Sequence, residues 1–251
     1  MAARSFVGAG DIYINRQVDG VSQGWVGPIY ANALQLQPSV NTIQSTSKGR
    51  HDYGQVLESV NIAQPTALTL EFKEVVGDIL TMAFLGTSST LNEASGTLTD
   101  AAGTTKKGRW VPIGKRNLAD LITVENSAGT TTYVEGTDYK LNRDLGWIMV
   151  LTTSAIADAA VLNVTGAYSA ATGTVVHGST RTEVRAQIKF DGINQADGTQ
   201  VTVDIWEAIV SADSAFDFLA DDFGTVSLTG NVKTPVGKTE PYTVTIQDPV
   251  V

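Results

Sequence analysis

The sequence predicts a mainly β protein, with one or two short helices and a smaller β module inserted into the main β domain. The first observation is strict alternation, in which Leu68, Leu70 and Phe72 are separated by Thr69 and Glu71. Successive side chains of a strand point to opposite faces, so this stretch predicts one face for a core and one for water. The second observation is that similar alternating stretches recur between turn signals along the chain. The third observation is the distribution of charge, because the middle of the chain is neutral while both end segments are acidic.

The first 95 residues predict strands, a long polar loop and a helix. Alternation at 11–15 and 33–37, with Asp19-Gly20 as a turn, indicates a hairpin-rich start. The strand within 55–74 contains Pro65, which a central strand tolerates poorly, so it predicts either two strands or one that bends or bulges. Residues 75–86 place apolar side chains at helical spacing before a glycine, which predicts a short helix over the sheet.

Residues 38–54 are rich in Ser, Thr, Asn and Gln, and they predict a long loop. A polar loop of this length inside a compact domain is either functional or a mobile surface segment. The residues at its tip are Lys48, Arg50, His51, Asp52 and Tyr53.

The middle of the chain predicts a separate module at 96–174. Residues 87–108 and 166–174 are rich in small and polar residues and predict linkers. Between them, short strands alternate with turns, which favours a small immunoglobulin-like β module. Its predicted strands are 121–125, 131–134, 147–151 and 160–164.

From residue 175 the pattern resembles that of the first part again. Alternating stretches at 183–191 and 201–206 predict a hairpin, and 225–232 and 242–247 predict two further strands. Residues 213–222 predict a short acidic helix capped by Asp213 or Ser214. The expected division is therefore a main domain of residues 1–95 and 175–251 with an insertion at 96–174.

Charge and composition narrow the function classes. The formal net charge is −9: residues 1–95 carry 5 Lys and Arg against 8 Asp and Glu, residues 96–172 carry 7 against 7, and residues 173–251 carry 5 against 11. This distribution disfavours tight nucleic-acid binding, which needs clustered cations. There is no cysteine, which excludes disulfides and thiolate metal sites. No apolar run of signal-peptide or membrane-span length occurs, so we expect no membrane insertion.

The sequence contains no recognisable motif for catalysis, cofactor binding or metal binding. His51 and His177 have no second ligand at metal-binding spacing. The stretch 191–198 resembles a calcium loop, but its register puts Ile193 where a carboxylate is required, so a hairpin turn is expected instead. The adjacent Asp221 and Asp222 do not face each other on a helix. We expect neither an enzyme nor a cofactor.

Several stretches of the two end segments form a recognisable arrangement: Gly10-Asp11-Ile12-Tyr13, the polar loop running into Gly54-Gln55-Val56 and the strand to Phe72, Val203-Asp204-Ile205-Trp206-Glu207-Ala208, Ala215-Phe216 and Asp221-Asp222-Phe223-Gly224. This arrangement resembles that of the major tail tube proteins of long-tailed bacteriophages. The resemblance covers 1–95 and 175–251, and it is one of arrangement rather than of a diagnostic motif.

The resemblance implies a subunit that forms hexameric rings, which stack into a tube lined by an inner β-barrel. The implied lumen residues are Thr69, Glu71, Glu183, Gln187, Asp191 and Asp204, with Arg185 and Lys189 as nearby counter-charges. An acidic wall would let phage DNA slide past without binding. The loop 41–54 resembles the segment that reaches the neighbouring ring, and the inserted module would lie outside the tube.

The resemblance also implies partners and a location. The partners are other copies of the chain, the tape measure, tail terminator and baseplate or tip proteins. The location is the virion tail, assembled in the host bacterial cytoplasm.

Two other function classes remain open. A lectin-like or capsid-decorating β protein would use Trp110 and Trp147 of the insertion for binding, although burial in a β core would explain them equally well. A glycan-acting enzyme would require a carboxylate pair that the sequence does not identify.

Overall fold

The computed structural model describes residues 5–247 and divides into two compact units. Unit 1 combines Met1–Ser89 with Val176–Val251, and unit 2 is Thr90–Val175. The sequence placed the first boundary near residue 95, six residues beyond the structural one. Strands β5 (Thr87–Glu93) and β12 (Ala171–His177) pair with each other where the chain passes between the units.

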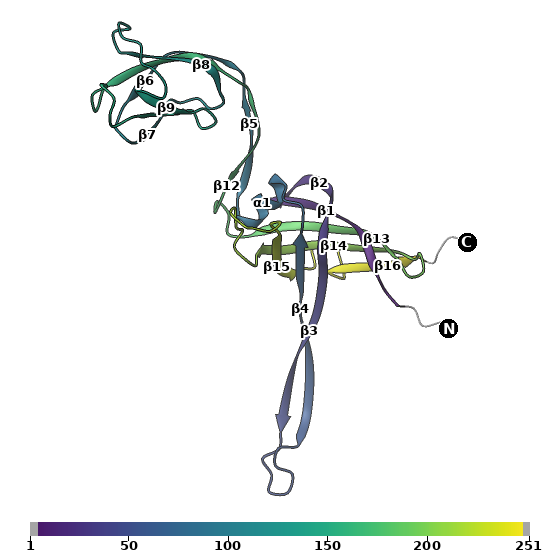
Figure 1. Cartoon of the computed structure of the whole chain (residues 1–251). Helices are drawn as coiled ribbons and strands as arrows, with labels where there is room; N and C mark the ends of the chain where they lie inside the picture. The colour runs from purple at the N-terminus through teal and green to yellow at the C-terminus, as the bar shows by residue number, and fades with distance from the viewer. Residues whose placement is uncertain (1–4, 248–251) are drawn as a thin grey trace. The chain divides into compact units, whose positions relative to one another are not determined.

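Unit 1 is built on one antiparallel eight-stranded sheet (Figure 1). Its strands are β1 (Gly8–Val18), β2 (Val21–Ile29), β3 (Ala31–Thr46), β4 (Val56–Phe72), β13 (Val184–Asn194), β14 (Gln200–Ala212), β15 (Val226–Val232) and β16 (Tyr242–Gln247). Their order is β2-β1-β13-β14-β15-β4-β3, and β16 pairs with the first half of β14. In the described chain β2 and β3 remain unjoined edges, so the sheet does not close into a barrel.

The predicted amphipathic strand forms the centre of the unit 1 core. Leu68, Leu70 and Phe72 of β4 are at most 1% exposed, and Leu70 lies opposite Leu228 of β15. Burial of each such side chain stabilises the fold by about 1.5–3 kcal/mol. The mainly β fold and the alternation in β4 are therefore confirmed.

A single α-helix, α1 (Gly77–Ala83), is present in the described residues. It begins after Val76 and buries Ile79, Thr81 and Met82 against the sheet. The predicted helix at 75–86 is confirmed, although it is shorter than expected. The second predicted helix, at 213–222, is wrong: this segment forms bends and turns. Its aspartates can bond nearby backbone instead of continuing a helix, as Asp217 does when its Oδ1 accepts the Leu219 N–H at 2.8 Å.

Residues 38–54 were expected to be a loop, but residues 38–46 belong to a strand and only 47–54 form a turn. β3 continues to Thr46 and β4 starts at Val56, so the two strands form one long hairpin that projects from the sheet (Figure 1). Between the pairs Gln37–Ala67 and Ser39–Gln64 the register shifts, because β4 has one extra residue there. Pro65 lies at this β-bulge, which resolves the alternatives that the sequence left open. We call residues 39–64 the distal hairpin.

Unit 2 contains two three-stranded antiparallel sheets around its own core. One sheet has the order β7-β10-β9 and the other β6-β11-β8. The strands are β6 (Gly96–Thr104), β7 (Trp110–Pro112), β8 (Leu118–Asn126), β9 (Tyr139–Asn142), β10 (Trp147–Val150) and β11 (Val161–Tyr168). Val124, Ile148 and Leu162 are at most 1% exposed and belong to one apolar cluster, separate from that of unit 1.

Three expectations for this region are corrected. The segments 87–108 and 166–174 are not linkers, because they include β5, β6, the end of β11 and part of β12. Residues 131–134 make only an isolated bridge through Thr132. There the side chain of Asn126 accepts the Thr130 N–H at 2.9 Å, which holds the chain in a turn.

Candidate functional site

The polar side of the unit 1 sheet gathers most of the predicted lumen residues. Strand register places Thr69 and Glu71 of β4 opposite Thr229 and Ser227 of β15, on the face away from Leu70. Alternation along β13 and β14 places further members on the same face. These are Gln187, Asp191 and Asp204. Glu183 immediately precedes β13 and bonds Arg185 of this face. The structure thus brings the six predicted residues to one side of one sheet.

Charge on this polar face is acidic and partly paired. Lys189 Nζ lies 3.0 Å from Asp204 Oδ1, and Asp191 lies directly opposite Asp11 of β1. Such exposed pairs contribute at most about 1 kcal/mol each. Register and ion pairs place at least six carboxylates here, against four cations. The carboxylates are Asp11, Glu71, Glu183, Asp191, Asp204 and Glu207, and the cations are Arg185, Lys189, Lys233 and Lys238. The described part of the face is therefore net negative.

Glu207 is a functional candidate that the sequence reasoning missed. Its side chain is 9% exposed, and its Oε1 lies 3.0 Å from Arg185 Nη1 and 3.3 Å from Lys233 Nζ. A register shift in β14 between the partners of Ala186 and Ile188 leaves both Trp206 and Glu207 opposite Gln187, so Glu207 is buried on the polar face beside Arg185. The alternation of polar and apolar residues along β14 breaks at Glu207-Ala208, and this break is the signal in the sequence that could have identified Glu207. The hydrogen bond with Glu183 raises the pKa of Arg185, so this cation remains charged beside Glu207.

The distal hairpin exposes apolar side chains on both faces. Ile43 and Val60 are cross-strand partners and are 55% and 52% exposed, with Ile62 beside them. The opposite face carries Val40 and Leu57, both 64% exposed. A two-stranded ribbon is only marginally stable in water by itself. Exposed apolar patches of this kind mark interaction sites.

The tip of the distal hairpin is an ordered turn. The Ser47 N–H donates to Gln55 O and the Gly54 N–H donates to Ser47 O, each at 2.8 Å. Gly54 has φ +84°, a conformation that favours glycine. The tip residues Lys48, Arg50, His51 and Tyr53 are exposed and Asp52 is half-buried. The five residues predicted to reach a neighbour therefore lie together at the end of a structured arm.

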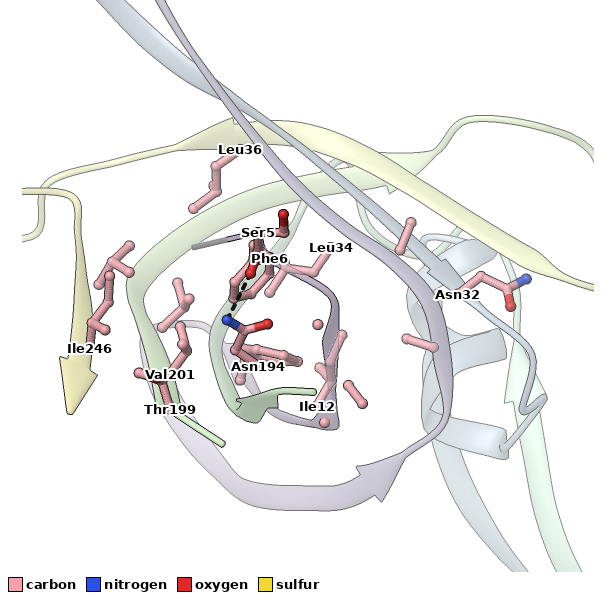
Figure 2. A pocket seen from close by; sticks show the side chains of 18 of the residues that line it. Ser5, Phe6, Ile12, Asn32, Leu34, Leu36, Asn194, Thr199, Val201 and Ile246 are labelled. Carbon is pink, nitrogen blue, oxygen red and sulfur yellow. Dashed lines mark hydrogen bonds between the residues drawn. The ribbon is translucent and has the colours of Figure 1, made fainter. Parts of the chain in front are cut away.

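An apolar groove of about 660 Å³ lies between β3, β1, β14 and β16 (Figure 2). Leu34 and Leu36 of β3 line it on one side, and Val201 of β14 and Ile246 of β16 on another. Asn194 at the groove donates from Nδ2 to Ser5 O at 3.1 Å and accepts the Val7 N–H at 2.9 Å, which holds the N-terminal segment there. Because its lining is mostly apolar, the groove is suited to binding apolar side chains.

The two tryptophans of unit 2 are not buried in its core. Trp110 and Trp147 are 42% and 39% exposed. In the pairing of β7 and β10, Trp110 lies opposite Met149 and Trp147 opposite Pro112, so both rings share one sheet face. The next residue on β10 after Trp147, Ile148, is buried in the core instead. The interpretation of these tryptophans as core residues is therefore wrong.

Neither histidine belongs to a cluster of metal-binding side chains in the described chain. His177 Nε2 lies 3.0 Å from Ser89 Oγ, and His51 is exposed at the hairpin tip. Within residues 5–247 no three His, Asp or Glu side chains lie close enough to hold a metal ion. Among the described helices, none is long and apolar enough to span a membrane.

Comparison with known proteins gives one family. A family model described as "Protein of unknown function UCP028589" matches residues 5–240. No curated protein matches the sequence. Because the model covers both units almost completely, the chain belongs to this family of unknown function.

Proposed function

We propose that the protein is a self-assembling structural subunit of a bacteriophage tail tube, in which rings of copies stack around a DNA channel. The single observation that carries this proposal is the distal hairpin. Ile43, Val60 and Ile62 are about half exposed on an arm whose two strands pair only with each other in the described chain. Such an arm gains stability when a neighbouring copy covers it.

The polar face of the sheet supports a channel wall. It presents more carboxylates than cations, and like charge keeps a polyanion from adhering. The unjoined edges β2 and β3 offer free backbone groups for pairing between copies, which would continue the sheet around a ring. The resemblance of unit 1 to major tail tube proteins agrees with both features.

Electron microscopy of the purified full chain tests this proposal. Across rising protein concentration we expect rings, short stacks or tubes with a central channel. A protein that stays monomeric at high concentration, in buffers that keep phage particles intact, contradicts the proposal.

A second function for unit 2 is favoured by its two tryptophans. Trp110 and Trp147 are partly exposed on one sheet surface, next to Lys140 and Asn142 of β9. Aromatic rings with adjacent polar groups are typical of sites that bind amphipathic ligands such as glycans. A glycan array with the full chain tests this, with Trp110→Ala and Trp147→Ala together as the comparison. Binding that the double variant loses supports a decorating role, and an array without signal contradicts it.

A further inference from the structure

A second exposed apolar surface lies at residues 213–224, which we call the aromatic loop. Phe218, Leu219 and Phe223 are 73%, 90% and 99% exposed. Soluble proteins rarely leave several large apolar side chains of one segment in water. The proposed function, as stated above, does not use this loop.

The aromatic loop is anchored to α1 by ring contacts. The Phe216 ring lies 6.4 Å from that of Phe84, the Phe218 ring stacks on Phe84 at 6.0 Å, and Phe216 and Phe218 meet edge to face at 4.8 Å. A Cβ atom at Gly224 would come within 3.2 Å of Phe216, so the loop packs closely where it returns to β15. Leu219 and Phe223 are therefore displayed from a structured base.

The charges of the aromatic loop and the hairpin tip are opposite. The loop carries Asp213, Asp217, Asp221 and Asp222 and no Lys or Arg. The tip carries Lys48 and Arg50 against a single carboxylate, Asp52. Within residues 5–247, neither of the two cations nor Asp221 or Asp222 forms an ion pair. Each surface thus combines exposed apolar side chains with a net charge opposite to that of the other.

The two surfaces lie at opposite ends of unit 1. Figure 1 shows α1 on one side of the sheet and the hairpin tip far beyond the other side. The distal hairpin spans about 30 Å at the usual rise per strand residue. Because the aromatic loop packs on Phe84 directly after α1, the tip cannot reach the loop of its own chain. A contact between them requires a second copy.

We propose that the distal hairpin of one copy docks head to tail on the aromatic loop of a second copy. Lys48 and Arg50 face Asp221 and Asp222, while Tyr53 and nearby apolar side chains cover Phe223 and Leu219. A contact between two different surfaces of the same chain repeats from copy to copy and generates an open stack. This inference rests on the proposed function, because it names the surface that receives the hairpin between rings.

Cysteine cross-linking tests the contact directly, since the chain contains no cysteine of its own. Tyr53→Cys protein is mixed with Phe223→Cys protein under mild oxidation, and disulfide-linked dimers are measured on non-reducing gels. We expect efficient cross-linking of this pair. As a control, Tyr53→Cys is mixed with Leu121→Cys, whose side chain in unit 2 is 89% exposed. Equal yields from both mixtures overturn the inference.

Charge reversal provides an independent readout. Asp221→Lys with Asp222→Lys should weaken association on the order of tenfold, because attraction becomes repulsion at two sites. Combining these changes with Lys48→Asp and Arg50→Asp should restore association. All four side chains are exposed, so the folded subunit should tolerate the changes. Absence of this rescue contradicts the pairing.

The outcomes separate this inference from the proposed function. Tubes that form without the specific cross-link overturn the docking surface and leave the tube subunit intact. A specific cross-link without tubes supports the docking and contradicts the tube. Absence of both overturns both.

Discussion

The two halves of the β3–β4 hairpin are the same pair of strands in two environments. Near the sheet, Leu68 and Leu70 are 1% exposed and pair within the core. Beyond the bulge at Pro65, Ile43 and Val60 are cross-strand partners with more than half of their surface in water. The difference is in what covers each half, since α1 and the other strands stop at the base. The base is stabilised by its own chain, and we infer that the distal hairpin is stabilised by another copy.

Phe72→Ala should have the largest effect, because it removes a ring that is 0% exposed at the base of the hairpin. Loss of a buried Phe costs about 3–5 kcal/mol, the removed contacts plus the cavity left behind. Chemical denaturation followed by circular dichroism measures this loss. A cost below about 1 kcal/mol would show that the base is not the core that the burial indicates.

Ile43→Asn with Val60→Asn tests the other half. The pair contributes about 0.2–1 kcal/mol to the free subunit, so its unfolding free energy should change little. Assembly should be lost, because the apolar surface of the arm becomes polar. Sedimentation velocity measures the assembly, with Thr42→Asn on the opposite face of the hairpin as the control. Normal assembly of the double variant would show that this face of the arm is not covered.

Glu71→Lys with Asp191→Lys tests the polar face without altering the hairpin. Asp191 is chosen over Asp204, because Asp204 already pairs with Lys189 at 3.0 Å. Tubes should still form, and DNA passage through tails built from the variant should slow, because the wall then attracts the polyanion. The isosteric changes Glu71→Gln and Asp191→Asn should have a smaller effect. Unchanged DNA release in the lysine variant would contradict the lumen assignment.

Arg143→Leu should have the smallest effect and is confined to unit 2. The bidentate hydrogen bond from Arg143, at 2.7 and 2.9 Å, lowers the pKa of Glu135. A carboxylate with a lowered folded pKa stabilises the fold above its unfolded pKa of about 4.3, and this stabilisation disappears as the pH falls through the folded value. The variant should therefore be less stable than the original by at most about 1 kcal/mol at neutral pH, and the difference should narrow at acid pH as Glu135 takes up its proton. Denaturation at the two pH values measures the difference.

The base of the hairpin was predictable from the sequence, while the distal hairpin was not. Leu68, Leu70 and Phe72 alternate strictly because one face of β4 is buried. In the distal hairpin no face is buried in the free chain, so Val40 and Ile43 fall on opposite faces and the segment resembles a polar loop. Alternation reports burial by the chain's own core. It does not detect strands whose cover belongs to another molecule.

The residues of the polar face were predictable from the alternation in sequence, but the β-bulge in β14 was not. Glu71, Gln187 and Asp204 were assigned to one face because each lies between apolar neighbours in sequence. The burial of Glu207 beside Arg185 depends on a register shift against β13, and register is set by the partner strand. The aromatic loop was predicted as a helix from the spacing of Phe216 and Leu219, but its aspartates favour turns.

Hydrogen exchange at the distal hairpin, compared between the free and the assembled protein, tests the central claim most directly. In the free subunit the amides of 39–46 and 56–64 should exchange much faster than those of 67–72, because only two strands protect them. On assembly the distal amides should become protected while those at the base change little. Distal amides that exchange equally fast in the free and assembled protein would contradict coverage of the hairpin by a second copy.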